Sequence, residues 1–382
     1  MRRLFFRILL FSIPVLLFFI PPVMILRVTG ESYLNLNSFL GSKVPYLLGY
    51  AYNEDNYRYL KWKEINQRER QTMIALGSSR VLQFRQDMFA VPFYNAGYTV
   101  SGIADFIPFL SAIPAQKYPD VLLIGLDQWM FNSNWDKVIP EKRKSTGYWE
   151  DSYSYYPSTK TFLRVWKDLL GGKYGLEVLQ SSGRGTSIRR VGLNAIVNSK
   201  GIRSDGSMQY GDQVTKLLLH DSTANDYGFK DSFRRVSKGN RRFEFGDTVN
   251  PSALRELDTL LSFCRSRGIQ VIGFIPPFAP AVNEAIGAGN KHAYLELIVP
   301  LTAPIFRQYG FELWDLSVPE SYQSSNTEML DGFHGSELTY TRMILFMAGN
   351  GSEIVRYTDP GRLGADIIKR KNSLEVYSYS AE

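Results

Sequence analysis

Four short runs of apolar residues recur along the chain at wide spacing. They are TMIAL (72–76), DVLLIGL (120–126), IQVIGFI (269–275) and FELWDLS (311–317). Uninterrupted apolar runs of this length indicate strands that are buried on both faces, as in a parallel sheet covered by helices. The pattern therefore predicts four strands of an α/β domain.

Segments between these runs show helical periodicity. In SALRELDTLLSFCRSRG, residues 252–268, four leucines fall on one face and Gly268 supplies a stop signal. A second helix is expected at about 291–308. Strands that alternate with helices predict right-handed crossovers and a three-layer α/β/α sandwich, in which ligands bind beyond the carboxyl ends of the strands.

The N-terminal segment has a different pattern. Residues 8–26 carry no charge, which is about the length needed to cross a hydrocarbon core of roughly 30 Å. The arginines before it, Arg2, Arg3 and Arg7, predict a cytoplasmic N-terminus with the bulk of the chain outside. A cleaved signal peptide and a buried core helix are the alternatives, although MILRVTGES offers no A-x-A cleavage site. We expect a single-pass protein of a bacterial inner membrane with an extracytoplasmic domain.

These patterns divide the chain into four parts. Residues 1–30 hold the anchor, 31–70 form a juxtamembrane connector with a helix, 71–358 form the α/β/α domain, and 359–382 are a C-terminal tail. Residues 132–250 interrupt the alternation of strands and helices with Gly, Ser, Tyr and basic residues, and we interpret them as an insertion. The tail could be a strand, a lid or disordered.

Composition narrows the classes of partner and cofactor. With 44% hydrophobic and 21% charged residues the chain can bury a core, and its net charge of +7 favours an acidic glycan or anionic lipid. Nucleic acid is disfavoured because the anchor places the domain outside the cell. The single cysteine, Cys264, excludes an intramolecular disulfide and a cysteine-based zinc site. Dinucleotide and P-loop signatures are absent, so we expect neither cofactor nor metal.

A serine and a histidine stand out as candidate chemistry. MIALGSSRV, residues 73–81, places two serines directly after the first predicted strand, and serine becomes a good nucleophile only when a base takes its proton. In MLDGFHGSEL, Asp331 precedes His334 by three residues, a spacing that lets the carboxylate accept from Nδ1 and leaves Nε2 free to take a proton. His220 and His292 are interpreted as structural or surface residues.

Together these residues resemble the SGNH (also called GDSL) hydrolase superfamily. GSSR resembles its first block, YNAGYTVSG its second and DGFH its last. The resemblance implies that Ser79 is the nucleophile, that His334 and Asp331 activate it, and that Gly97 lends a backbone N–H to the oxyanion hole.

In the third block this chain departs from the family pattern. The family usually has Gly-x-Asn there, whereas this chain has GLD, ending in Asp127. An ionised Asp cannot donate a hydrogen bond to an oxyanion. Either Gln128 or Asn132 donates instead, or only the backbone N–H groups of Ser79 and Gly97 do, or Asp127 has another task.

The resemblance covers about 72–131 and 252–350 and points to acyl transfer. Membrane-anchored proteins with this arrangement are similar to the alginate O-acetylation proteins and to the D-alanyl transfer protein of teichoic acid synthesis. The implied function is serine-dependent acyl transfer, such as O-acetylation, to a cell-surface or exported polysaccharide, beside a membrane-bound O-acyltransferase. A carbohydrate esterase of the same fold and a non-catalytic glycan-binding scaffold are the alternatives.

Substrate contacts are expected from residues beside the serine and at the start of the insertion, namely Arg80, Asp127, Asn132, Tyr148 and Trp149. The two aromatic residues belong to a cluster that could stack on sugar rings or pack the core of the insertion. A basic stretch, FRRVSKGNRRFEF (233–245), could attract an anionic glycan or lipid headgroups, or be a solvated surface.

Overall fold

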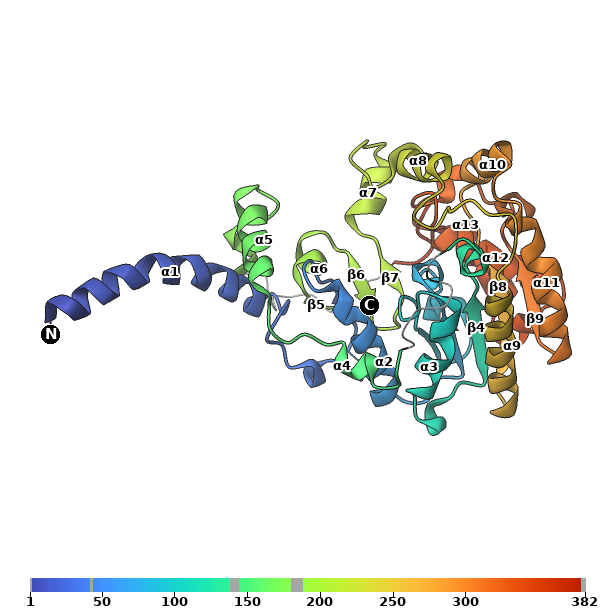
Figure 1. Ribbon diagram of the computed structural model, residues 1–382, viewed down its shortest axis with the longest axis horizontal. Helices are drawn as coiled ribbons and strands as arrows, with labels where there is room; N and C mark the ends of the chain where they lie inside the picture. The colour runs from blue at the N-terminus through green and yellow to red at the C-terminus, as the bar shows by residue number, and fades with distance from the viewer. Residues whose placement is uncertain (1, 42–43, 136, 138–143, 180–187, 379–382) are drawn as a thin grey trace.

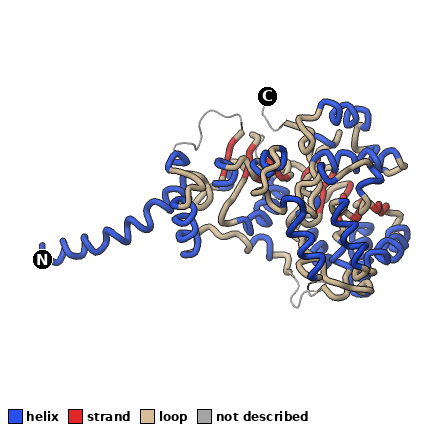
Figure 2. Tube along the Cα trace, turned by 90° about the horizontal axis from the view of Figure 1, so that it is seen from above, coloured by secondary structure: helices blue, strands red, loops and turns tan. Residues whose placement is uncertain are grey.

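The computed structural model describes residues 2–41, 44–135, 137, 144–179 and 188–378. Small parts of the predicted connector, insertion and tail therefore lie outside the described residues. The described chain is an α/β protein with two sheets and one long N-terminal helix, which projects from the rest (Figures 1 and 2).

The larger sheet has five parallel strands in the order β3-β2-β4-β8-β9. Their bounds are β2 Met73–Leu76, β3 Phe93–Asn95, β4 Val121–Gly125, β8 Gln270–Ile275 and β9 Glu312–Asp315. The four predicted apolar runs all contain a strand, whereas the three-residue β3 was not predicted. The chain leads from β2 to β3 on one side of the sheet and from β4 to β8 on the other side. Where neighbouring strands have connections that diverge in this way, parallel sheets form a crevice at their carboxyl ends.

Helices cover both faces of this sheet. Along each strand successive side chains point to opposite faces, so Ile74 packs in one core cluster and Ala75 in the other. The first cluster is closed by helices α3 (Phe106–Ser111), α9 (Pro251–Ser266) and α11 (Tyr294–Gln308), and the second by α12 (Glu337–Gly349) and α13 (Pro360–Lys369). Helices α9 and α11 match the two predicted helices.

A second, four-stranded sheet has the order β5-β1-β6-β7. Its bounds are β1 Tyr46–Leu48, β5 Arg189–Val191, β6 Gly201–Arg203 and β7 Met208–Gln209. Strand β1 comes from the predicted connector and pairs with β5 and β6 of the predicted insertion, parallel to one and antiparallel to the other. Helix α2 (Tyr57–Gln67) shares a core cluster with this sheet. Connector and insertion thus fold together as one unit.

The remaining helices surround the two sheets. Their bounds are α1 Arg2–Val28, α4 Tyr148–Asp151, α5 Thr159–Leu170, α6 Leu193–Val197, α7 Asp212–Leu218, α8 Lys230–Lys238 and α10 Pro280–Gly289. In α1 the segment Leu10–Val28 is long and apolar enough to cross a membrane, a test that a signal sequence also meets. The end of α1 belongs to the folded unit, because Ile25 and Leu26 are completely buried.

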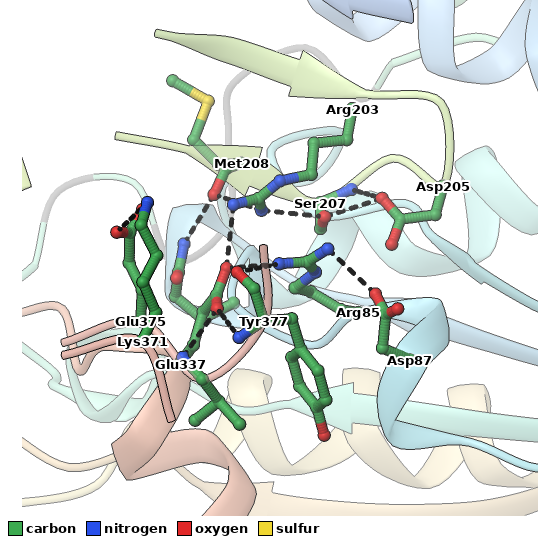
Figure 3. A network of polar contacts seen from close by, with 12 residues as sticks. Arg85, Asp87, Arg203, Asp205, Ser207, Met208, Glu337, Lys371, Glu375 and Tyr377 are labelled. Atoms are coloured by element: carbon green, nitrogen blue, oxygen red, sulfur yellow. Dashed lines mark hydrogen bonds and ion pairs between the residues drawn. The ribbon is translucent and has the colours of Figure 1, made fainter. Parts of the chain in front are cut away.

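A buried polar network joins the two sheets (Figure 3). Glu337, the first residue of α12, accepts hydrogen bonds through Oε1 from Arg85 Nη1 (2.9 Å) and from Arg203 Nη2 (2.8 Å) at the end of β6. Its Oε2 accepts from the backbone N–H groups of Val376 (3.1 Å) and Tyr377 (3.2 Å). One carboxylate therefore holds the second sheet and the C-terminal tail against α12.

The β6–β7 turn docks onto the edge of the parallel sheet at β3. The backbone N–H of Asn95 donates to the carbonyl of Asp205 (2.8 Å). Lys61 of α2, which is buried, donates from Nζ to the carbonyls of Asn95 (3.1 Å) and Gly206 (2.7 Å). Burial lowers the pKa of Lys61 well below its ordinary value, although the charge of Asp205 opposes this shift.

Candidate active site

The serine pair lies in a tight turn at the carboxyl end of β2. Ser78 is buried, and its Oγ accepts from the backbone N–H of Arg80 (3.2 Å), so its hydroxyl caps the 3-10 turn Ser79–Val81. Ser79 begins that turn and is partly exposed. The structure thus gives the two hydroxyls different tasks, with Ser78 stabilising the turn and Ser79 presented to solvent.

Three glycines at the ends of neighbouring strands bring this turn close to the sheet. Gly77, Gly97 and Gly125 surround the side chain of Val81, and a Cβ on them would lie only 2.7, 2.5 and 2.6 Å from its methyl groups. Any larger residue would push Val81, and the serine turn with it, away from the sheet. The glycines of the three sequence blocks are therefore explained by close packing.

A continuous chain of hydrogen bonds connects Ser79, His334 and Asp331. The Nε2 atom of His334 lies 2.9 Å from Ser79 Oγ, and Nδ1 lies 2.8 and 2.9 Å from the two carboxylate oxygens of Asp331. The three residues come from two loops, and Ser79 and His334 are 255 positions apart in the sequence. This is the arrangement in which histidine takes the serine proton and the carboxylate orients the imidazole.

Backbone amides hold Asp331 in its charged form. Its Oδ1 accepts from the N–H groups of Phe333 and His334, both at 2.8 Å. Burial alone raises the pKa of Asp331, but the charge of His334, its hydrogen bond and these two amides together hold that pKa below its ordinary value. The carboxylate is therefore ionised at neutral pH and can orient an imidazolium.

Arg80 connects the serine turn to the histidine loop. Its side chain is buried, and it donates to the carbonyl of Phe333 from Nε (3.1 Å), to Gln128 Oε1 (2.6 Å) and to the carbonyl of Pro276 from Nη2 (2.9 Å). The guanidinium also stacks on Phe278, 4.4 Å from the ring centroid. The prediction that Arg80 binds substrate is wrong, because its contacts lie inside the protein and none is left facing solvent. It positions the loop that carries His334.

Two of the expected oxyanion donors are already used within the protein. The backbone N–H of Gly97 donates to Asn95 Oδ1 (2.8 Å). The amide of Gln128 accepts from Arg80 and donates through Nε2 to the carbonyl of Pro276 (2.7 Å). The oxyanion roles predicted for Gly97 and Gln128 therefore do not fit these contacts. The backbone N–H of Ser79, by contrast, donates no hydrogen bond within the described part of the chain.

Asp127 lies at the end of β4, at the crevice between β2 and β4. It is buried, its Oδ1 lies 3.5 Å from Arg80 Nη1, and its Oδ2 has no hydrogen-bond partner among the described residues. Burial raises the pKa of Asp127, although Arg80, Ser78, Arg242 and His334 each lower it in part. A carboxyl group with a raised pKa can carry a proton and donate it, as the Asn of the usual third block would donate its amide hydrogen.

Arg242 is a charged residue near the site that the sequence did not single out individually. It and Arg241 both have positive φ angles, 80° and 52°, which cost free energy for residues with a Cβ and occur mainly at functional sites. Its guanidinium lies 4.9 Å from the centroid of the Trp129 ring, and its charge acts on the pKa of both Asp127 and Tyr98. Arg242 thus adds positive charge at the crevice.

Three other predicted substrate contacts are structural. Trp149 is fully buried and donates from Nε1 to the carbonyl of Thr99 (3.2 Å), so it cannot stack on a sugar. Asn132 is also fully buried and donates from Nδ2 to the carbonyl of Glu244 (2.6 Å). For both residues these contacts within the protein do not fit the predicted substrate contact. Tyr148 is half-buried, and its hydroxyl accepts from Arg58 (3.1 Å).

A polar cavity of about 310 Å³ opens beside Asp331. Most of its lining comes from residues of the predicted insertion, including Lys200, Tyr210 and Lys216. The ring of Tyr210 also lies near the imidazole of His334, with 6.4 Å between centroids. Of the three residues of the hydrogen-bond chain, the cavity reaches only Asp331. A larger cavity of about 500 Å³, between α10 and α11, reaches Gln128 but not the triad.

No protein-family model, curated protein or solved structure matches this chain. Among the residues that the structure describes, no group of three or more His, Cys, Asp and Glu side chains is arranged to hold a metal ion. What the site can do is therefore inferred from its geometry and from the motif resemblance.

Proposed function

We propose that this protein is a membrane-anchored serine acyltransferase of the SGNH type, which transfers an acyl group, such as acetyl, to a cell-surface or exported polysaccharide. The observation that carries the proposal is the hydrogen-bond chain from Ser79 through His334 to Asp331. Nucleophile, base and orienting carboxylate lie within hydrogen-bond distance in one site, although they are far apart in the sequence.

The fold supports the same assignment. Five parallel strands with helices on both faces are what a three-layer α/β/α sandwich requires, and Ser79 and Asp127 follow the two strands that border the crevice. The fold alone does not fix the reaction. It does put the reactive hydroxyl where such sheets bind their ligands.

In the proposed reaction Ser79 attacks the carbonyl carbon of an acyl donor while His334 Nε2 takes the hydroxyl proton. The tetrahedral oxyanion accepts from the backbone N–H of Ser79 and, when its carboxyl carries a proton, from Asp127. Collapse expels the leaving group, which receives the proton from His334, and leaves acyl-Ser79. A sugar hydroxyl then gives its proton to His334 and attacks the acyl carbon. Collapse breaks the ester bond to Ser79, whose Oγ takes the proton back from His334 as the O-acylated sugar departs.

Helix α1 supports a location at a membrane, and we propose a bacterial inner membrane with the catalytic domain on the extracytoplasmic side, as the arginines before the apolar segment predict. Its apolar segment has the length of a span, and its last turn is part of the folded core, which a cleaved signal peptide would not be. A membrane-bound O-acyltransferase is then the natural acyl donor, and the exported polysaccharide is the acceptor.

We favour transfer over hydrolysis because the predicted insertion, which could build an acceptor site, lines a polar cavity that reaches Asp331. Transfer requires that a sugar hydroxyl reach acyl-Ser79 before water does, so an acceptor site next to the triad is needed. The test is incubation of the purified protein with an activated acetyl ester and candidate oligosaccharides, followed by mass spectrometry. Acetylated sugar supports a transferase, whereas free acetate with no acetylated sugar for any acceptor supports the esterase alternative.

The Ser79→Ala and Ser78→Ala variants make a matched pair for this assay. Ser79→Ala removes the nucleophile, and we expect turnover to fall on the order of 10⁴-fold or more. Ser78→Ala removes a turn cap, at an expected cost of about 1 kcal/mol of stability, and a hydroxyl that lowers the pKa of Asp127. Its loss favours the protonated form of Asp127, so we expect turnover to be largely kept. A fluorophosphonate probe that labels native protein but not Ser79→Ala would exclude the scaffold alternative, and equal labelling of both would contradict the mechanism.

A further inference from the structure

Helix α5 (Thr159–Leu170) packs directly against the anchor helix α1. Its buried face, which includes Phe162 and Val165, shares one core cluster with Ile25 and Leu26 at the end of α1. In Figure 1, α5 stands beside the end of α1 and apart from the parallel sheet. The helix therefore belongs to the part of the protein nearest the proposed membrane.

Contact between α5 and α1 extends well into the apolar segment. Trp166 donates from Nε1 to the carbonyl of Phe18 (2.8 Å), and the Phe162 ring meets the Phe19 ring edge-on at 5.3 Å. Phe18 lies ten residues before Val28, which is about 15 Å along an α-helix. Helix α5 thus lies beside the second half of the segment Leu10–Val28.

The position of α5 limits where the bilayer can end. If the hydrocarbon stopped before Phe18, the remaining helix of residues 2–17 would span only about 24 Å, which is less than the roughly 30 Å required. That remainder would also include Arg7. The outer boundary of the hydrocarbon must therefore cross α1 at the level of α5.

The outward side of α5 has the composition of a membrane surface helix. Leu163 and Leu170, which are seven residues apart and so on one side, are 55% and 80% exposed. An adjacent strip carries three exposed basic residues at helical spacing, Lys160, Arg164 and Lys167, of which Arg164 also contacts the Tyr52 ring, 5.1 Å from its centroid. On α1, at the level where α5 packs, Phe19, Ile20 and Met24 are also exposed.

We propose that α5 is a second membrane contact, an amphipathic helix that lies in the outer leaflet against the anchor. Leu163 and Leu170 enter the acyl-chain region, Trp166 stays against Phe18 of the anchor, and the basic strip binds anionic phospholipid headgroups. The inference rests on the membrane location in the proposed function, but it is independent of the acyl-transfer chemistry.

The test places a fluorescent reporter at single exposed sites of the full-length protein. The native Cys264 is buried, so introduced cysteines are labelled selectively. An NBD group is attached at Leu163→Cys or Leu170→Cys, with Leu16→Cys in α1 as the positive control. The matched negative control is Ile368→Cys on α13, a helix that also exposes an apolar residue, at 82%. Each protein is reconstituted into phosphatidylethanolamine and phosphatidylglycerol vesicles.

We expect reporters at 163, 170 and 16 to shift to shorter emission wavelength and to lose fluorescence when doxyl-labelled lipid is present, while the reporter at 368 does neither. Quenching at 16 but not at 163 and 170 would overturn this inference and leave the anchor intact. Absence of quenching at 16 would overturn both. Shielding of 163 and 170 from iodide without quenching by lipid would mean that a second copy covers this face, and would also overturn it.

The basic strip has a test of its own. We compare the double variant Lys160→Glu and Lys167→Glu with the protein that keeps both lysines, each with NBD at position 163. Doxyl-labelled lipid should quench the double variant less when phosphatidylglycerol is present, and about equally in phosphatidylcholine alone. If the two proteins are quenched to the same extent in both lipid mixtures, charge has no part in the contact.

Discussion

The guanidinium of Arg80 connects segments that are far apart in the sequence, and its replacement tests how strongly catalysis depends on their alignment. In Arg80→Lys a single ammonium cannot reach Phe333, Gln128 and Pro276 together, so the loop that carries His334 loses its support. We expect kcat to fall on the order of 10²-fold with little change in KM, because a displacement of about 1 Å can have that effect.

Steady-state kinetics on an activated acetyl ester measures this effect. Arg70→Lys is the matched control, because Arg70 pairs with Asp120 at the surface and its replacement should leave kcat unchanged. A rise in KM with kcat intact would show instead that Arg80 contacts the substrate.

Asp127 predicts a pH dependence with a definite sign. Its raised pKa keeps the proton on the carboxyl above the ordinary Asp value, so the oxyanion donor is present at low pH and is lost as pH rises through that pKa. We expect kcat/KM of the native protein to decline on the alkaline side, and Asp127→Asn, whose amide donates at any pH, to keep its activity there. Loss of activity in Asp127→Asn at every pH would mean that the negative charge is required.

Arg242 should set the position of that decline. Its positive charge lowers the pKa of Asp127, so Arg242→Gln is expected to raise that pKa and move the alkaline decline of kcat/KM to higher pH. Arg241→Gln is the matched control, because Arg241 is the exposed neighbour with the same kind of strained backbone. A shift of similar size in both variants would show a general effect of net charge.

At this scale the sequence could predict residues whose chemistry is local. Asp331 and His334 are three positions apart, and Ser79 follows a buried strand, so short motifs were enough to predict that these residues lie together. Arg80 and Trp149 could not be placed, because a charged or aromatic residue in a motif looks the same whether it faces a ligand or the core. Arg80 is buried against residues 128, 276 and 333, and Trp149 against residue 99. These segments come together only in the folded protein.

Among the elements, α12 depends on the buried carboxylate at its first residue. Glu337→Ala would leave Arg85 and Arg203 buried without this partner, and removal of one member of such a group costs about 3–5 kcal/mol. We expect a loss of unfolding free energy of that order in urea denaturation. Glu353→Ala removes an exposed pair with Arg356 and should cost about 1 kcal/mol or less. Equal losses would contradict the role of the network.

Prediction of the elements succeeded where strands are long and buried on both faces. The runs at 121–125 and 270–275 form the centre of the sheet, and their continuous apolar pattern follows from that position. Strand β3 has three residues, too few to show a pattern. The second sheet was missed because β1 pairs with strands that lie about 140 residues later, and no local signal records such a pairing.

For the whole molecule, Glu31 controls how the anchor joins the second sheet. Its carboxylate accepts from the backbone N–H groups of Ala51 and Tyr52, both at 2.7 Å, and of Leu193 (3.1 Å). Burial raises its pKa to about 7, although these hydrogen bonds oppose the shift. Between its ordinary pKa and about 7 the folded protein keeps a proton that the unfolded chain releases, so the free energy of unfolding should fall as pH rises through that window.

The expected fall is on the order of 3 kcal/mol, since each pKa unit corresponds to about 1.4 kcal/mol. Urea denaturation of the full-length protein in detergent micelles at several pH values measures it. Glu31→Gln, which does not titrate, should lack this slope, whereas Glu54→Gln at an exposed position should retain it. A slope that persists in Glu31→Gln would assign the effect to other groups.

The second sheet also determines where the parallel-sheet domain lies relative to the anchor. The chain passes from this sheet to the parallel one after β1, returns with β5 and leaves again after β7, and Glu337 adds a further link. A domain on a single flexible tether would sweep through a wide volume above its anchor. The three chain connections between the two sheets hold the domain at a fixed distance from the anchor instead. If α1 spans a membrane, Ser79 lies at a set distance from the lipid surface, and under the proposed function a polymer would be modified only as each sugar passes that level during export.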